Sequence, residues 1–534
     1  MAARDRFTRR SVLGAGAALS GGVLAAACAP PRPGPVSPDA TQRSERRRVV
    51  VVGTGFGGAV TALRLAQRGV DVTLVERGKR WASGTRGAFP TMFAPDRRVS
   101  WLSEANTATE KLFPAPPWQR YTGLLERIPG DGMDVMCAAA VGGGSVPYHG
   151  MSVQPRSDLF DRVMPGALDY DEFDQRWYPM VIDALGASPL PDDVLASTRY
   201  SSSRLFMDIV RDAGLPEATR TPMPVDWDVV RRELRGELPA VISRGDVIYG
   251  ANGPGKRSLD TNYIPAAEAT GRVELLAQHQ VQRVQRGGDG TWVVSTDRLD
   301  TDGVVQEFVE ITSDALFLCA GSANTTKLLV RAAALGDIPD LPDDTGAWWS
   351  TNGDLLTTQI LDQPTGTFQG GPASIASYDL DDPEGPVAVL FGPIPLPFEA
   401  NAMEVVGIFI PDGHGRFTYD PRRDEARLRF PPEAHGASLA MARRRIARWG
   451  RAAGTLTSID MTARDPATYH PLGGAVIGKV CDAYGRVMDQ PGLYVNDGAL
   501  IPGSTACANP SLTIAALAER NAAHIVANDV DVLF

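Results

Sequence analysis

The sequence predicts an α/β protein, α+β in part, with a Rossmann-like dinucleotide-binding domain and an inserted substrate-binding domain of sheet and helices. Three observations support this prediction. A strand, a glycine turn, a helix and a second strand follow one another within residues 49–76. Short strands recur from residue 272 to residue 323, and a strand followed by a long helical pattern ends the chain. The length of 534 residues allows roughly two to four domains.

The glycine turn follows four consecutive valines at 49–52, which are typical of a strand buried on both faces of a parallel sheet. Gly53, Gly55 and Gly58 give the G-x-G-x-x-G spacing. Gly53 permits the tight turn, Gly55 lets backbone approach a pyrophosphate, and Gly58 lets the helix pack against the strand. The N-terminus of the next helix offers unpaired N–H groups and a positive dipole end to phosphates.

The acidic residue of this unit is Glu76, which ends the second strand about 20 residues after the glycines. Its carboxylate can accept both hydroxyls of a ribose and disfavours a 2′-phosphate. The unit therefore predicts dinucleotide binding, against the alternative of a glycine turn without a ligand. Taken alone, it does not distinguish NAD from FAD.

The composition is ordinary for a globular protein, with 43% hydrophobic and 22% charged residues. The net charge of −10 argues against a nucleic-acid partner. The cysteines beyond the N-terminal region lack the C-x-x-C spacing of a metal site, so we expect buried thiols and no metal. These are Cys137, Cys319, Cys481 and Cys507.

The N-terminal region predicts export. Arg9 and Arg10 precede an apolar run of small residues at 12–27, as in a twin-arginine signal peptide over residues 1–28. Cleavage after Ala27 would secrete the protein, whereas a lipid on Cys28, which lies in a lipobox-like context, would attach it to the membrane surface. We favour the lipoprotein, and expect an extracellular or cell-surface location in both cases. Because the twin-arginine route carries folded proteins with their cofactors, it favours tightly bound FAD over diffusible NAD.

The rest of the pattern divides the chain into domains. A disordered tether is expected at 29–46, because the segment is rich in proline, serine and arginine. The dinucleotide-binding domain is expected to combine three stretches of chain, and the substrate-binding domain two. The three stretches are 47–155, 265–350 and 462–534, and the two are 156–264 and 351–461.

A second glycine cluster, at 142–145, indicates that backbone comes close to another bulky group. Further ordered motifs follow along the chain, at 94–101, 141–145, 255–260, His470-Pro471-Leu472-Gly473-Gly474 and the run from Asn496 to Pro510. Together with the first glycine turn, these motifs resemble the glucose-methanol-choline (GMC) family of flavin oxidoreductases, and within it the bacterial cholesterol oxidases that bind FAD non-covalently.

The resemblance implies FAD as the cofactor. The pyrophosphate would lie at the first glycine turn, the adenine at the backbone of Val281, the flavin ring near the second cluster and the ribityl phosphate near Asp497. The residues implied to bind FAD are Gly53, Gly55, Phe56, Gly57, Gly58, Glu76, Gly143, Gly144, Ser145, Val281, Asp497, Gly498 and Asn509.

The resemblance also implies an activity, the oxidation of a 3β-hydroxysteroid such as cholesterol with O₂ as the acceptor. His470 and Asn509 match the pair of residues with which the family holds the alcohol hydroxyl and accepts its proton. Glu399, in a proline-rich apolar stretch, is the candidate base for isomerising a steroid double bond, with Glu404 as the fallback. A carboxylate in such a setting would have a raised pKa.

Four positions depart from the family pattern near the expected site. They are Tyr148, His149, Ala475 and Ser511. These departures leave open another bulky alcohol as substrate and a non-oxygen electron acceptor. An NAD-dependent dehydrogenase and a non-catalytic lipid-binding surface lipoprotein are the remaining alternatives. We expect a monomer.

Overall fold

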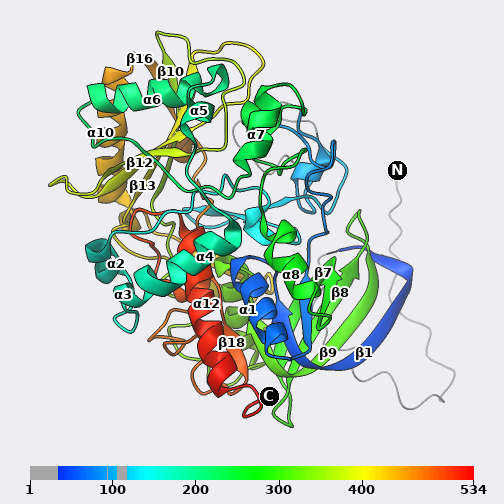
Figure 1. Cartoon of the computed structure of the whole chain (residues 1–534). Coiled ribbons are helices and arrows are strands. Elements are labelled where there is room, and N and C mark those ends of the chain that lie inside the picture. The colour runs from blue at the N-terminus through cyan, green and yellow to red at the C-terminus, as the bar shows by residue number, and fades with distance from the viewer. Residues whose placement is uncertain (1–33, 93, 105–116) are drawn as a thin grey trace, which may run out of the picture.

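The computed structural model describes residues 34–92, 94–104 and 117–534. The predicted export signal, its cleavage or lipidation site at Cys28 and residues 29–33 of the predicted tether lie outside the described residues. The described chain forms two lobes, each built around one large sheet (Figure 1). The end of the C-terminal helix and the first strand both lie in the lower lobe of that view.

The lower lobe is the predicted Rossmann-like domain. Its seven-stranded sheet has the order β6-β2-β1-β9-β8-β7, with β18 paired to the end of β9. β1, β2, β6, β9 and β18 are parallel neighbours, whereas β8 runs antiparallel to both β7 and β9. The strands are β1 (Val36–Val52), β2 (Val72–Glu76), β6 (Val273–Ala277), β7 (His279–Arg286), β8 (Trp292–Leu299), β9 (Val305–Leu318) and β18 (Leu493–Val495). The carboxyl ends of the parallel strands meet at one edge, where ligands bind in open α/β sheets.

Helices cover this sheet and close the first core. They are α1 (Phe56–Gln67), α8 (Tyr263–Glu268), α9 (Ser322–Leu335) and α12 (Pro510–Asn528). α1 packs against both α8 and α12. The valines at 49–51 are fully buried in the sheet, so the prediction of a strand covered on both faces is confirmed.

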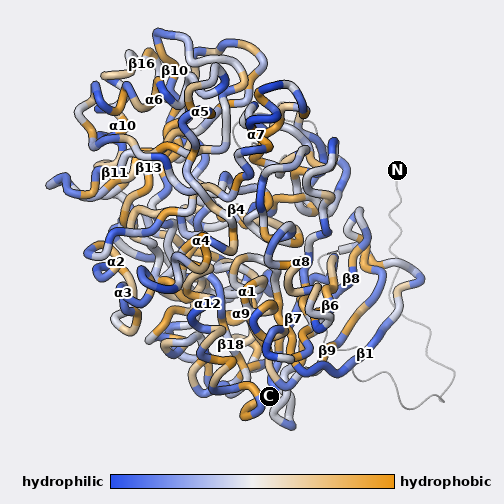
Figure 2. Tube along the Cα trace, in the orientation of Figure 1, coloured by the Kyte–Doolittle hydropathy of each residue, from blue (hydrophilic) through white to orange (hydrophobic). Residues whose placement is uncertain are grey.

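The N-terminal half of β1 corrects the predicted tether at 29–46. Residues 36–46 form a strand whose partner is β9, in a register that includes Thr41 opposite Glu307. Ion pairs support it, at 3.4 Å between Arg43 and Glu307 and 2.9 Å between Arg47 and Glu274. The segment is largely hydrophilic (Figure 2), and this composition is why the sequence predicted disorder. It is ordered because its backbone hydrogen-bonds to the edge of β9.

The upper lobe contains a six-stranded antiparallel sheet of order β16-β10-β13-β12-β11-β5. Helices α6 (Ser201–Asp212) and α10 (Gly436–Ala452) pack on it around a second core. Phe206, Phe391 and Trp449 meet in the middle of this core. The strands are β5 (Thr219–Arg220), β10 (Asp354–Leu361), β11 (Ile375–Asp379), β12 (Val387–Gly392), β13 (Ala402–Phe409) and β16 (Thr455–Asp460).

The stretch 156–264, which we assigned to the substrate-binding domain, contributes to both lobes. Its first helices, α2 (Ser157–Val163), α3 (Tyr170–Glu172) and α4 (Tyr178–Leu185), supply Phe160, Tyr178 and Leu185 to the first core. Helices α5 (Asp192–Leu195) and α7 (Trp227–Leu234) supply residues to the second core. The expected boundary at residue 156 therefore differs from the packing, because α4 packs against α12.

Two further sheets are small. β17 (Ala467–Thr468) pairs with β4 (Asp134–Ala138), which pairs with β3 (Leu125–Ile128). β14 (Arg416–Asp420) and β15 (Glu425–Arg429) form a hairpin against α9. β17 follows the short helix α11 (Met461–Arg464) and directly precedes the His470 motif.

Within the described residues, no helix has the length and apolar character that a membrane span requires. Cys319, Cys481 and Cys507 are buried free thiols and Cys137 is half-buried. No group of three or more histidine, cysteine, aspartate or glutamate residues is arranged to hold a metal ion in the same part of the chain.

Candidate active site

A cavity of about 1170 Å³ extends from the glycine turn after β1 to the face of the antiparallel sheet. Most of the residues that the sequence predicted for cofactor and catalysis line it. They are Gly53, Gly55, Phe56, Gly57, Glu76, Gly143, Gly144, Val281, Asp497, Gly498, His470 and Asn509. Gly58, Ser145 and Glu399 are not among the lining residues.

The glycines of the turn differ in what they make room for. Gly53 has φ +100°, and a Cβ there would lie 2.3 Å from the Cys319 carbonyl oxygen. A Cβ on Gly57 would lie 1.6 Å from the Asn496 carbonyl oxygen, and one on Gly58 would lie 1.9 Å from that of Gly53. These three glycines are therefore needed for packing between backbones. A Cβ on Gly55 would meet no protein atom within 4 Å, so Gly55 keeps open the cavity itself.

Glu76 lies at the end of β2 and is 6% exposed. One carboxylate oxygen accepts hydrogen bonds from the Thr54 N–H at 3.1 Å and its hydroxyl at 2.7 Å, and the other accepts one from Gly78 N–H at 2.8 Å. Burial raises its pKa, although these hydrogen bonds act in the opposite direction. The oxygen that accepts from Gly78 can accept a further hydrogen bond from a ribose hydroxyl.

The second glycine cluster lies against the first turn. A Cβ on Gly143 would be 2.6 Å from Gly55 Cα, whereas one on Gly144 would meet nothing within 4 Å. Ser145 is buried behind the cavity wall, where its hydroxyl donates to Gly142 O and accepts from Leu259 N–H. Ser145 therefore fixes the loop, and its predicted contact with the flavin stays a prediction.

Asp497 follows β18 and lines the cavity. Its carboxylate accepts hydrogen bonds from Thr325 Oγ1 at 2.6 Å, Gly321 N–H at 2.9 Å and Ala499 N–H at 2.8 Å. Burial raises the pKa of Asp497 to about 6. The open space beside Gly55 and Gly144, the N-terminus of α1 and the carboxylate of Glu76 together fit FAD.

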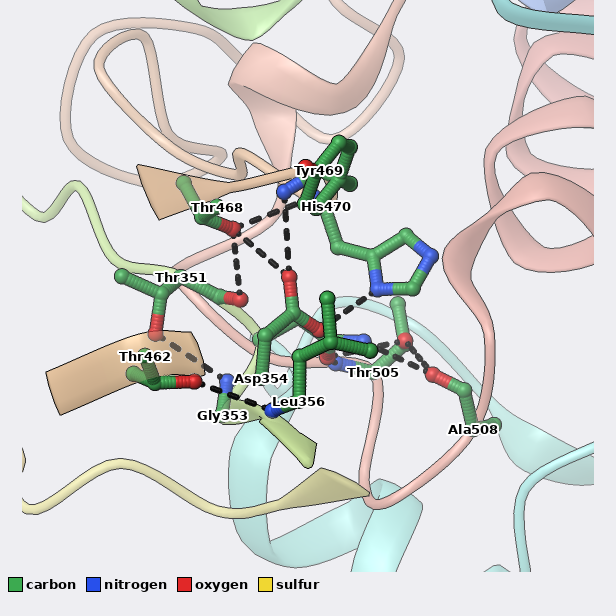
Figure 3. A network of polar contacts seen from close by, with 11 residues as sticks. Thr351, Gly353, Asp354, Leu356, Thr462, Thr468, Tyr469, His470, Thr505 and Ala508 are labelled. Carbon is green, nitrogen blue, oxygen red and sulfur yellow. Dashed lines mark hydrogen bonds and ion pairs between the residues drawn. The ribbon is translucent and has the colours of Figure 1, made fainter. Parts of the chain in front are cut away.

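His470 lies in the loop after β17, and Asp354 begins β10. The Nδ1 atom of His470 is 2.6 Å from Asp354 Oδ1 (Figure 3). Burial alone would lower the pKa of His470, but the charge and hydrogen bond of Asp354 outweigh it and the pKa is raised. The other ring nitrogen points away from Asp354 (Figure 3). No described residue hydrogen-bonds to that nitrogen, so it is free to meet a substrate hydroxyl.

Asn509 is the residue before Pro510, where α12 begins. Its side chain does not cap that helix, and among the described residues none hydrogen-bonds to its amide. His470 and Asn509 line the same cavity. The structure thus brings together the two residues that the sequence predicted as a pair.

Glu399 does not have the environment that the sequence predicted. Its carboxylate accepts hydrogen bonds from the backbone N–H groups of Thr365, Gly366 and Asn401, at 3.1, 2.7 and 2.8 Å. Burial acts to raise its pKa, but these hydrogen bonds outweigh it and the pKa is lowered. Glu399 therefore stabilises a turn, and its assignment as the isomerase base is corrected.

Glu404, the fallback, has the expected environment. It lies on β13 opposite Gly392 of β12 and lines the cavity. A Cβ on Gly392 would lie 2.9 Å from the Glu404 Cβ, so the missing side chain makes room for Glu404 to lie across β12. Burial raises the pKa of Glu404 to about 7, and its carboxyl has no hydrogen-bond partner among the described residues.

The apolar part of the cavity wall follows from strand alternation. Side chains two residues apart point to the same face of a strand. Leu356 on β10, Val406 on β13 and Leu390 on β12 form one cross-strand row on the cavity side, next to the row that contains Glu404. An apolar surface therefore separates Glu404 from Asp354 on this face.

Three of the four departures from the family pattern line the cavity, namely Tyr148, His149 and Ser511. His149 accepts a hydrogen bond from Ala373 N–H at 3.2 Å, and burial together with nearby Lys256 lowers its pKa to about 4. Ala475 is fully buried and is not among the lining residues. Three of the four differences thus fall on the wall that a substrate or flavin would touch.

Sequence reasoning missed Asp354. It follows Asn352 and Gly353, a combination typical of a turn. Nothing in the local pattern indicates a contact with a histidine more than a hundred residues away. The two residues meet because β16 pairs with β10 and the chain then continues through α11 and β17 to His470.

Comparisons with known proteins agree with this geometry. Residues 432–518 match the family described as GMC oxidoreductase, and residues 48–127 match the family described as FAD dependent oxidoreductase. A cholesterol oxidase of Mycobacterium tuberculosis is 26% identical over 89% of this chain and 90% of its own length. A cholesterol oxidase of Acinetobacter baumannii is 22% identical over 90% of this chain and 94% of its own.

Solved structures with low sequence identity share the fold. A fungal aryl-alcohol oxidase superposes with a TM-score of 0.62 at 16% identity, covering 91% of this chain and 99% of its own. Pyridoxine 4-oxidase from Mesorbium loti gives a TM-score of 0.57 at 18% identity, covering 90% and 99%. Two segments of the chain are thus similar to the GMC oxidoreductase and FAD dependent oxidoreductase families, and both segments contribute residues to the cavity.

Proposed function

We propose that this enzyme oxidises the 3β-hydroxyl of a cholesterol-like steroid, passes the electrons to O₂ and then isomerises the double bond of the product. The observation that carries the proposal is Glu404, a carboxyl with a pKa near neutrality on an apolar cavity wall shared with His470 and Asn509. An alcohol oxidase without an isomerisation step has no need of such a group. The relatives named cholesterol oxidase support the steroid substrate.

The oxidation step requires that a hydride leave carbon and a proton leave oxygen. FAD, when bound, supplies the acceptor for the hydride. The free ring nitrogen of His470 accepts the hydroxyl proton, and the raised pKa lets His470 hold that proton near neutral pH. No described residue hydrogen-bonds to the Asn509 amide. This amide can therefore donate a hydrogen bond to the hydroxyl oxygen and orient the hydroxyl for hydride transfer.

The isomerisation step moves one proton within the steroid. The Glu404 carboxylate removes a proton from the carbon between the new carbonyl and the double bond, and returns it to the far carbon of that double bond. No proton is gained or lost overall. A pKa of about 7 suits both halves of this exchange, because the carboxyl can accept and release a proton at similar cost.

A pair of matched variants tests the role of Glu404. Glu404→Gln should release the unconjugated 5-en-3-one from cholesterol, because the amide cannot shuttle the proton. Glu399→Gln should still release the conjugated 4-en-3-one, because Glu399 contacts only a turn. Separation of the products by liquid chromatography distinguishes the two. Conjugated product from Glu404→Gln at the wild-type rate would remove Glu404 from the mechanism.

The acceptor and the substrate are tested separately. Peroxide should form in proportion to the cholesterol consumed under air. Cholesterol that bleaches the flavin anaerobically, without peroxide under air, would assign a non-oxygen acceptor. Bleaching by another bulky alcohol and not by any sterol would assign a different GMC alcohol oxidoreductase, an outcome motivated by Tyr148 and His149 on the cavity wall.

We further propose export through the twin-arginine signal and attachment through a lipid on Cys28. The motifs at 9–10 and 24–28 support this location. Mass spectrometry of the N-terminus of the protein purified from its native cells tests it. A diacylglycerol-modified Cys28 is expected, and a free N-terminus following Ala27 would indicate secretion without an anchor.

A further inference from the structure

We propose that residues 350–354, which lead into β10, are a positioning segment for both catalytic loops. In this proposal Asp354 sets the proton position on His470, and Asn352 holds the loop that carries Asn509. The inference rests on the proposed roles of His470 and Asn509. Neither Asp354 nor Asn352 is assigned a contact with substrate.

Asp354 is tied to the His470 loop by more than one contact. Oδ1 lies 2.6 Å from His470 Nδ1, while Oδ2 accepts hydrogen bonds from Thr468 Oγ1 at 2.8 Å and Tyr469 N–H at 3.1 Å (Figure 3). The carboxylate therefore has a fixed orientation. Because an ionised carboxylate can only accept, the proton of the neutral imidazole lies on Nδ1. Nε2 is then left with its lone pair for the substrate hydroxyl.

Asn352 performs the equivalent task for the second loop. Its amide donates to Ala508 O at 2.8 Å, and its carbonyl accepts from Thr505 N–H at 2.7 Å. The loop needs such support, because Ala506 and Cys507 have φ values of +59° and +62°. Left-handed backbone is unfavourable for a residue with a side chain. These contacts end at the residue directly before Asn509.

Backbone hydrogen bonds place the segment between the two loops. Ser350 and Leu472 exchange hydrogen bonds at 2.9 and 3.0 Å, and Asn352 N–H donates to Gly503 O at 3.1 Å. The same few residues thus contact the chain on both sides of the catalytic pair. A shift of this segment would move His470 and Asn509 together and would keep their mutual geometry.

The first test is made on the wild-type holoenzyme with ¹⁵N-labelled histidine. The chain has six histidines, and a His470→Ala sample identifies the signal of His470. We expect the neutral ring to carry its proton on Nδ1. A proton on Nε2 would overturn the proposal, whatever the behaviour of any variant.

The second test uses Asp354→Asn, with Asp354→Glu as the conservative variant. The amide removes the charge and can donate to Nδ1, so we expect anaerobic flavin reduction to slow by about 10²-fold, with a small change in KM. Asp354→Glu should recover part of the rate. Asp460→Asn is the matched control. Asp460 lies on β16, the strand next to β10, where it caps α11 and pairs with Arg443 of α10.

The pH profile separates this role from a structural one. The titratable groups around the His470 loop are Asp354 on β10, Glu404 on β13, Tyr469 beside His470, Tyr249, and Arg127 on β3 with its partner Asp465. Loss of the Asp354 charge should move the acidic limb of the reduction rate to lower pH by about one unit. The acidic limb of the pH–rate profile should lie at the wild-type pH in Asp460→Asn.

Asn352→Asp tests the second half of the proposal. Asp tolerates the φ of +56° at this position, but its carboxylate cannot donate to Ala508 O. We expect flavin reduction to slow by about 10-fold with FAD still bound and the pH limb unchanged. Wild-type rates in both Asp354→Asn and Asn352→Asp would overturn the positioning role. Wild-type rates in His470→Ala and Asn509→Ala would overturn the proposed function itself.

Discussion

The two ends of the cavity are built differently. At the turn between β1 and α1, missing side chains let backbones touch, as where a Cβ on Gly57 would lie 1.6 Å from the Asn496 carbonyl. On the antiparallel sheet, side chains that are distant in sequence converge on one face, as where Asp354 meets His470. The cofactor end is therefore local in sequence and intolerant of added atoms. The catalytic end depends on the register of strands and on charge.

The largest effect is expected from adding one carbon at the cofactor end. Gly57→Ala should lose FAD and about 3 kcal/mol of unfolding free energy, because neither backbone can move away cheaply. Flavin absorbance of the purified protein and its chemical unfolding curve measure the two losses.

Gly55→Ala is the matched variant, because its Cβ would meet no protein atom within 4 Å. The unfolding free energy of the FAD-free protein should match that of wild type, while FAD affinity falls. An equally destabilised FAD-free Gly55→Ala protein would contradict the distinction between packing glycines and the cofactor glycine.

The next largest effect is expected at the catalytic end. His470→Ala should slow flavin reduction by about 10²–10⁴-fold, since the hydroxyl proton has no acceptor, while the protein stays yellow. Stopped-flow absorbance under anaerobic conditions measures the rate. His524→Ala serves as the control and should react at the wild-type rate, because His524 lies near the C-terminal end of α12 and stacks on Tyr484.

A smaller effect is expected in stability at Glu404. Its pKa is raised from 4.5 to about 7 in the folded protein. Folding therefore favours the protonated carboxyl, and this contribution is present below pH 4.5 and lost as the pH rises through about 7. The Glu404→Gln side chain cannot ionise. The unfolding free energy of this variant should therefore exceed that of wild type by about 1–3 kcal/mol at pH 8 and equal it near pH 4.5. Urea unfolding at both pH values checks the sign, and a less stable variant at pH 8 would contradict the burial of this carboxyl.

The smallest effect concerns the hydrophilic half of β1. Residues 41–47 pair with β9, so about half of their amides should exchange slowly with deuterium, since the strand pairs on one side only there. A tether would exchange all of them within seconds. Hydrogen exchange followed by mass spectrometry on peptides from this segment distinguishes the two.

Much of the first lobe could be predicted because its signals are local. The four valines, the glycine spacing and Glu76 follow one another in the chain, and each has one physical role. The hydrophilic half of β1 could not be predicted, because its order comes from a partner strand more than two hundred residues away. The composition of a segment shows how much apolar surface it can bury, but it does not show which strand the segment will pair with.

Glu399 and Glu404 show the same limit within one short stretch. The prolines around Glu399 indicated an apolar setting, yet its carboxylate accepts three backbone N–H groups at a turn. Glu404 lies on a strand beside a glycine, and only the register of β12 with β13 shows that Gly392 makes room for it. A carboxylate's pKa follows from its hydrogen bonds and burial, which a sequence pattern does not contain.

The central claim is that His470 accepts the proton of a steroid hydroxyl beside bound FAD. Anaerobic mixing of the purified holoenzyme with cholesterol, followed by flavin absorbance, tests this most directly. We predict rapid bleaching in wild type and bleaching slowed by at least about 10²-fold in a yellow His470→Ala protein. Wild-type flavin that no sterol bleaches, or a His470→Ala protein that bleaches at the wild-type rate, would contradict it.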